Sequence, residues 1–209
     1  MGKTEGDTSN GFSQASFRGR NDDVSESSTE FIAGLNRDWT QKTDVNFRVR
    51  FVIEQSTALT TDLTTRFGLR RSVNGGRYFV VKPDDTQVII VSSNAVGFNQ
   101  GDDCTEILGG TGAFISDNNA VVESDTGRLS GISGWTGSTT EFIETEWCLQ
   151  LVSGTLDDGD TIELRLERAN QDLFDEGYAN TPKIVVSKKT ILDLRGAELK
   201  LAGNELRLT

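Results

Sequence analysis

Apolar and polar residues alternate along three stretches of the chain, 45–54, 143–151 and 162–167. Because successive side chains of a strand point to opposite faces, each stretch predicts a strand with one buried face and one polar face. Trp147 stands among the inward positions of its stretch, so its ring is predicted to belong to the core.

Turn signals separate these predicted strands. Asn74-Gly75-Gly76 predicts a tight hairpin, since Asn and Gly accept the positive φ that such turns need. Residues 83–85 (Pro-Asp-Asp) and 157–159 (Asp-Asp-Gly) predict further turns. Such signals recur about every ten to twenty residues, and no stretch shows a convincing helical period. The pattern predicts an all-β domain over residues 44–188, an antiparallel β-sandwich of jelly-roll or immunoglobulin-like type.

A seven-residue repeat runs through the end of the chain, within residues 189–209. Two leucines stand two positions apart in each copy, so they share one face of a strand but would lie about 200° apart on a helix. Strands this short cannot fold alone, whereas copies from three chains could close a shared leucine core without free edges. We therefore expect an oligomerisation segment, as a trimer, built on Leu192, Leu194, Leu199, Leu201, Leu206 and Leu208.

Residues 1–43 are rich in Ser, Gly, Asp, Asn and Glu and contain only scattered apolar residues. Such a segment is not expected to form its own core. We expect an extended arm laid across a partner protein, with the apolar residues as contacts; the alternative is an arm that lies over its own domain. The predicted contact residues are Phe12, Phe17, Phe31, Leu35 and Trp39.

Composition excludes several classes of partner and chemistry. The formal net charge of -11 disfavours nucleic acid and anionic membranes as partners. The chain has no histidine, which removes the commonest general base and metal ligand. Cys104 and Cys148 are too few for a zinc site and are expected as two buried thiols, a disulfide being the alternative. No signal peptide or membrane-spanning run is recognisable, so we expect synthesis in a cytoplasm.

Other chemical signals have simple structural explanations. Glu144 and Glu146 share a strand face and could form a carboxylate pair of a polysaccharide hydrolase, but charged residues on a solvated sheet face need no catalytic role. The acidic residues at 157–160 and the glycines at 109–112 are typical of turns. Arg48 and Arg50 are expected to pair with carboxylates on neighbouring strands. We therefore predict no catalytic residue, no metal site and no cofactor.

Five stretches in the middle of the chain follow one another in the order and spacing of a known β-sandwich module. They are NFRVRFVIEQ (46–55), FGLRRSVNGGRYFVV (67–81), CTEILGGTGAFI (104–115), TEWCLQLVSGTLDDGDTIELRL (145–166) and TPKIVV (181–186). On these stretches the chain resembles a module of structural proteins in tailed bacteriophages. The resemblance covers about two thirds of the chain and excludes the N-terminal arm and the leucine repeat. It implies a non-enzymatic part of a head, tail or fibre.

These observations predict a non-enzymatic structural component of a phage virion, a capsid decoration or cement protein or a head fibre, assembled in the host cytoplasm. Its predicted partners are further copies of the chain and the major capsid protein or another virion protein. The alternative is a receptor- or glycan-binding tip of a tail or head fibre. In that case Trp135, in a glycine-rich segment at 127–137 expected to be a loop, is the candidate contact with a host surface glycan.

Overall fold

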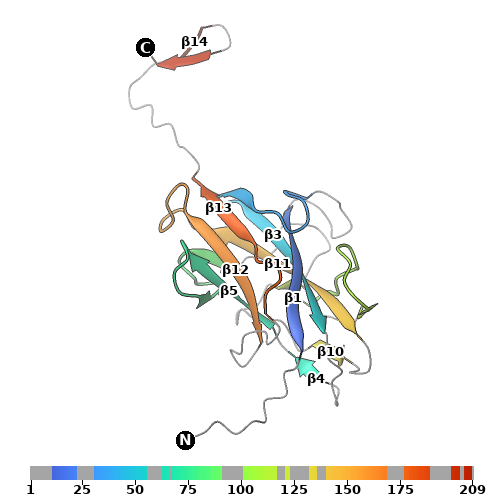
Figure 1. The fold of residues 1–209 in the computed structure, drawn as a ribbon. Coiled ribbons are helices and arrows are strands. Elements are labelled where there is room, and N and C mark those ends of the chain that lie inside the picture. Colours follow the sequence, from blue (N-terminus) through green and yellow to red (C-terminus); the bar gives the residue numbers. More distant parts are fainter. Residues whose placement is uncertain are drawn as a thin grey trace, which may run out of the picture.

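A computed structural model of the chain describes residues 11–22, 31–55, 63–65, 67–90, 101–116, 121–122, 132–135, 140–168, 177–188, 199–202 and 205–208. All regular structure in these ranges is β, with no helix (Figure 1). Consequently, none of the described residues belong to a helix that could cross a membrane.

The first large sheet has six strands. Four of them are antiparallel neighbours in the order β1-β3-β11-β7, and two short strands, β8 and β9, run parallel to β11. The strands are β1 (Phe12–Asn21), β3 (Asn46–Gln55), β7 (Val88–Ile90), β8 (Ala113–Phe114), β9 (Val121–Val122) and β11 (Glu141–Leu151).

The second large sheet has five strands in the order β2-β13-β12-β5-β6, in which β2 runs parallel to β13. Two further pairs, β4–β10 and β14–β15, form separate two-stranded sheets. The strands of these three sheets are β2 (Trp39–Lys42), β4 (Leu63–Thr65), β5 (Phe67–Val73), β6 (Phe79–Val80), β10 (Ile132–Trp135), β12 (Thr161–Arg168), β13 (Lys183–Ser187), β14 (Leu199–Ala202) and β15 (Glu205–Leu208).

One apolar core joins the two large sheets, as in a β-sandwich. The inward residues of β3 and β11 meet those of β5, β12 and β13 in a single buried cluster. Trp147 is fully buried in it, which confirms its predicted place. The prediction of alternating faces is also confirmed, because Val49 is paired with Trp147 and Phe47 with Leu149 in the antiparallel register.

The expected N-terminal arm is wrong for the parts of residues 1–43 that the structure describes. β1 pairs with β3 along its whole length, and β2 pairs with β13. Phe12, Phe17 and Trp39 belong to the sandwich core, with exposed fractions of 1%, 2% and 6%. The alternative, a segment that lies against its own domain, describes these residues better, because their rings gain more from burial in the core than a solvated arm could offer.

The parallel strand pairs also differ from the purely antiparallel sandwich that was predicted. β2 comes from the segment that was expected to be an arm, so its pairing with β13 was not anticipated. Close packing accompanies this arrangement: a Cβ on Gly19 would lie 3.0 Å from the Trp39 ring. Glycine in β1 therefore lets the β2 indole approach the strand backbone.

The predicted hairpin at Asn74-Gly75-Gly76 is confirmed. Asn74 and Gly75 have φ values of 50° and 71°, and the Gly76 N–H donates to the Val73 carbonyl oxygen at 2.9 Å. The turn joins β5 to β6, which are antiparallel. Residues 127–137 were expected to be a loop, but β10 lies within them and pairs with β4.

Candidate functional site

The polar face of the first sheet is buried, although it was expected to be solvated. Arg20 on β1, Arg48 and Arg50 on β3, and Glu144 and Glu146 on β11 all have exposed fractions of 0%. Strand register brings them together, because Arg20 lies opposite Arg48 and Arg50 lies opposite Glu146. Together with Asp22, they form a buried network of three guanidinium groups and three carboxylates.

Glu146 is the centre of this network. Its carboxylate accepts hydrogen bonds from Arg50 Nε at 2.6 Å, from Arg20 Nη1 at 2.9 Å and from Arg48 Nη1 at 3.3 Å. Burial raises the pKa of Glu146, but the three arginines, Arg50 first, outweigh burial and leave the pKa below its ordinary value. A group held ionised in this way is unsuited to act as a general acid.

Arg48 connects the network to the end of β1. Its Nε donates to Asp22 Oδ1 at 2.7 Å. Burial lowers the pKa of Arg48, but Cys148 opposite it on β11, together with Asp22 and Glu146, raises the pKa above its ordinary value. The guanidinium therefore stays charged inside the protein.

Residues 101–116, which we call the strap, are tied to this face of the sheet. Glu144 Oε1 accepts the backbone N–H groups of Ile107, Leu108 and Gly109 at 3.0, 2.6 and 2.9 Å. Arg50 Nη1 bonds both Glu144 Oε2 at 2.9 Å and the Thr105 carbonyl oxygen at 2.7 Å. The buried charges therefore satisfy the strap backbone as well as each other.

Two glycines let the strap pack closely against β11. A Cβ on Gly112, whose φ is +100°, would lie 2.0 Å from the Thr140 carbonyl oxygen. A Cβ on Gly110 would lie 2.6 Å from the Phe142 ring. Both residues were predicted to be turn glycines. Close contact requires glycine at both positions, and the positive φ requires it at Gly112 as well.

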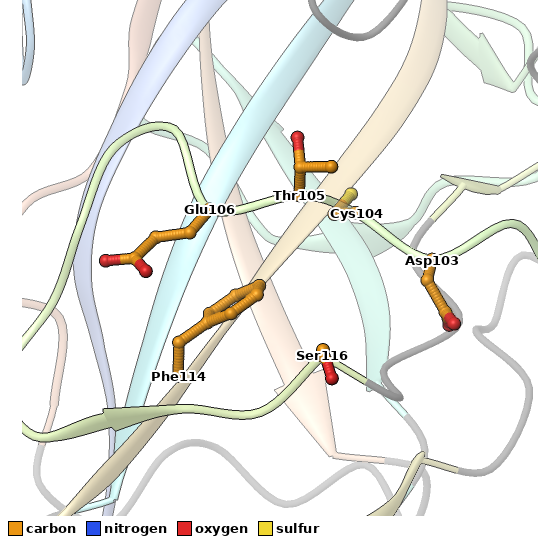
Figure 2. Close-up of a pocket in the computed structure, with 6 residues that line it drawn as sticks. All are labelled: Asp103, Cys104, Thr105, Glu106, Phe114 and Ser116. Carbon is orange, nitrogen blue, oxygen red and sulfur yellow. The ribbon is translucent and has the colours of Figure 1, made fainter.

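A shallow hollow of about 480 Å³ opens on the strap. Figure 2 shows the ring of Phe114 and the carboxylate of Glu106 on one side of it, with Cys104 and Asp103 further along the strap. The remaining lining residues are Thr105 and Ser116.

The outer face of the second sheet is partly exposed. The Arg165 guanidinium lies 4.5 Å from the Tyr78 ring centroid and 4.9 Å from that of Tyr178. Arg165 also pairs with Glu163 at 2.9 Å, and these two side chains are 33% and 25% exposed. Pairs exposed to this degree contribute little to stability. The charge network of functional interest is therefore the buried one.

The acidic turn after β11 is organised by its own hydrogen bonds. Asp160 Oδ2 accepts the Asp157 N–H at 2.7 Å, and Gly159 has a φ of +87°. The hydrogen bond from Asn74 is the main cause that lowers the pKa of Asp160. Within the described ranges, no group of three or more Cys, Asp or Glu residues could hold a metal ion.

Two of the predicted arm contacts lie nearer the surface than the three buried rings. Phe31 is half-buried and stacks under the Arg18 guanidinium, which lies 3.6 Å from its ring centroid. Leu35 is 45% exposed, so it is the predicted contact residue that is most accessible to another molecule.

The C-terminal leucines were predicted to mediate oligomerisation, and four of them lie in the β14–β15 sheet. Leu199 is paired with Leu208, and Leu201 with Leu206. Leu192 and Leu194 lie outside the described residues. Trp135 ends β10 opposite Leu63, and its side chain is not described, so its predicted glycan contact stays a prediction.

Sequence reasoning placed Glu144 and Glu146 on one strand face but missed the strap that covers them. The charged side chains of the site neutralise each other, and their hydrogen bonds link β1, β3 and β11 to the strap. Comparisons with protein-family models, curated proteins and solved structures found no match for this chain.

We expect the network to make stability depend on pH at the acid end. The folded-state pKa of Glu146 lies below its ordinary value of 4.5, so its stabilising effect is complete above that pH. The effect is lost as the pH falls through the lower folded-state pKa. Urea unfolding measured between about pH 7 and pH 3 should show a smaller acid loss in a Glu146→Gln variant. Equal acid slopes in the two proteins would contradict this.

Proposed function

We propose that this chain is a non-enzymatic structural component of a bacteriophage virion, a decoration or fibre protein that self-associates through its C-terminal repeat. The phage assignment rests on the sequence resemblance of residues 46–186. The jelly-roll or immunoglobulin-like type of the sandwich, the trimeric state and the virion location are parts of the same proposal.

The observation that carries the proposal is the β14–β15 sheet. Among the strands that the structure describes it pairs with none outside itself, and in Figure 1 the strand β14 lies apart from the sandwich. Its register places leucine opposite leucine at two positions and Lys200 opposite Arg207 at the position between them. A lone two-stranded sheet is marginal in water, so a leucine face of this kind calls for a partner. Identical ribbons from other copies supply a matching one.

The buried network supports a structural role over a catalytic one. Glu144 and Glu146 are occupied by arginines and backbone N–H groups. Because both carboxylates are fully buried, neither is presented to a polysaccharide. A cross-braced sandwich suits a particle surface, where the subunit must hold its shape while its ends or loops make contacts.

The sequence predicts that the N-terminal segment attaches the subunit to the particle. The structure limits which residues of this segment can contact a partner protein. The rings of Phe12, Phe17 and Trp39 are committed to the core of the subunit itself. Leu35 is exposed and can still meet the major capsid protein or another virion protein.

Removal of residues 190–209 should lower the oligomeric state and leave the sandwich folded. Sedimentation velocity measures the first result and circular dichroism the second. As matched variants of the full chain, Leu201→Ser with Leu206→Ser should dissociate the oligomer. Lys200→Ser with Arg207→Ser should leave it intact, because these residues alternate with the leucines along the strands. A full-length chain that is monomeric at every concentration would refute the proposal.

A further inference from the structure

The two cysteines of the chain belong to opposite sides of one buried interface. Cys148 lies on β11 with an exposed fraction of 0%. Two-residue spacing places it on the same strand face as Glu146 and Glu144, the face that the strap covers. Cys104 belongs to the strap. It is 2% exposed, while its neighbours Asp103 and Thr105 are exposed.

The hydrogen bonds of the strap show how it runs over β11. Residues 107–109 lie over Glu144, because their N–H groups donate to its carboxylate. Thr111 lies over the start of β11, because its N–H donates to Glu54 Oε1 at 2.8 Å and Glu54 is paired with Phe142. From residue 111 back to residue 107 the strap therefore passes from Phe142 to Glu144, and the residues before it, 104–106, continue towards Cys148.

Length supports the same placement. Glu144 and Cys148 are four residues apart on a strand, a span of about 13 Å. Cys104 stands three residues before Ile107, where the strap bends, and three extended residues reach about 10 Å, most of that span. A buried side chain between two exposed neighbours points to the sheet beneath it, which directs the Cys104 thiol towards the face that carries Cys148.

Cys104 also lines the hollow on the strap, as Figure 2 shows. A small oxidant can approach the strap side of the interface through this hollow. Cys148 is fully buried, so an oxidant that enters the hollow meets Cys104 first.

We propose that Cys104 and Cys148 are a redox pair that forms a disulfide between the strap and β11 under oxidising conditions. With oxidised glutathione, the Cys104 thiolate displaces one glutathione and forms a mixed disulfide. The Cys148 thiolate then attacks the Cys104 sulfur and displaces the second glutathione. Two protein thiols are oxidised, one glutathione disulfide is reduced to two thiols, and the two protons leave with these products.

Oxidised glutathione added to the reduced full-length chain should remove both titratable thiols. A non-reducing digest should contain a peptide pair that joins Cys104 to Cys148. The bond closes a long loop, so the melting temperature should rise by about 5 °C and return after reduction. Cys148→Ala should instead retain glutathione on Cys104, and Cys104→Ala should not form the bond.

The digest of the wild-type protein tests the proposal without depending on either variant. Two thiols that remain titratable after oxidation, glutathione kept on Cys104 of the wild-type chain, or disulfides found only between chains would each overturn it. None of these results bears on the C-terminal repeat, so the proposed oligomerisation is tested separately.

Discussion

Replacing Glu146 by glutamine should lower the free energy of unfolding by about 3–5 kcal/mol at neutral pH. The substitution keeps the shape of the side chain but removes the charge that faces Arg20, Arg48 and Arg50. Its amide nitrogen also brings a donor where the carboxylate had only acceptors. Three buried guanidinium groups would share the two remaining carboxylates, and the cost of burying an unpaired charge is large.

Urea unfolding at neutral pH measures this loss, with Asp157→Asn as the matched control. Asp157 pairs with Lys188 at 3.1 Å, but its side chain is 90% exposed. The same carboxylate-to-amide change should therefore cost less than about 1 kcal/mol there. Comparable losses in the two variants would show that the buried network does not stabilise the fold.

Replacing Phe17 by alanine should lower the free energy of unfolding by about 3–5 kcal/mol. The ring is 2% exposed and packs against Trp39, with 6.3 Å between the ring centroids. Its loss leaves a cavity between β1 and β2, which both come from the segment that sequence patterning assigned to an arm. The two interpretations predict opposite results: in an arm that binds a partner, the substitution would reduce attachment and leave subunit stability unchanged.

Leu35→Ala is the control for Phe17→Ala within the same segment. Leu35 is 45% exposed, so its truncation should change stability by less than about 1 kcal/mol. Thermal or urea unfolding of the two variants compares them directly. If Phe17→Ala proved as stable as Leu35→Ala, β1 would not be an integral part of the sandwich. By the same reasoning, a chain without residues 1–43 should fail to fold, because β1 pairs with β3 along its full length.

Local sequence signals were reliable where the physical cause is itself local. The alternation in 45–54 and 143–151 predicted β3 and β11 and the inward position of Trp147. The positive φ values of Asn74 and Gly75 belong to the residue types that adopt them most easily. Such features depend on two or three neighbouring residues, so they do not depend on which distant segments pack against them.

The N-terminal segment shows why composition alone was misleading. Its apolar residues are sparse and its polar residues many, which is typical of a segment without its own core. Phe17 and Trp39 are buried because the core belongs to other strands, and no window of local sequence contains those strands. A strand added to an existing sheet needs few apolar residues of its own, since its neighbours supply the rest of the buried surface.

The amino-acid sequence by itself determined that the protein is built of strands, where its long central strands run, and which residues of β3 and β11 share a face. Only the tertiary structure decided that the polar face is buried. The strap reaches Glu144 from about 35 residues away in the chain. The period of apolar residues and their strand propensity depend on neighbours along the chain, whereas burial depends on which distant segment covers a sheet face. The polar face of the first sheet can be buried only because its charges neutralise each other.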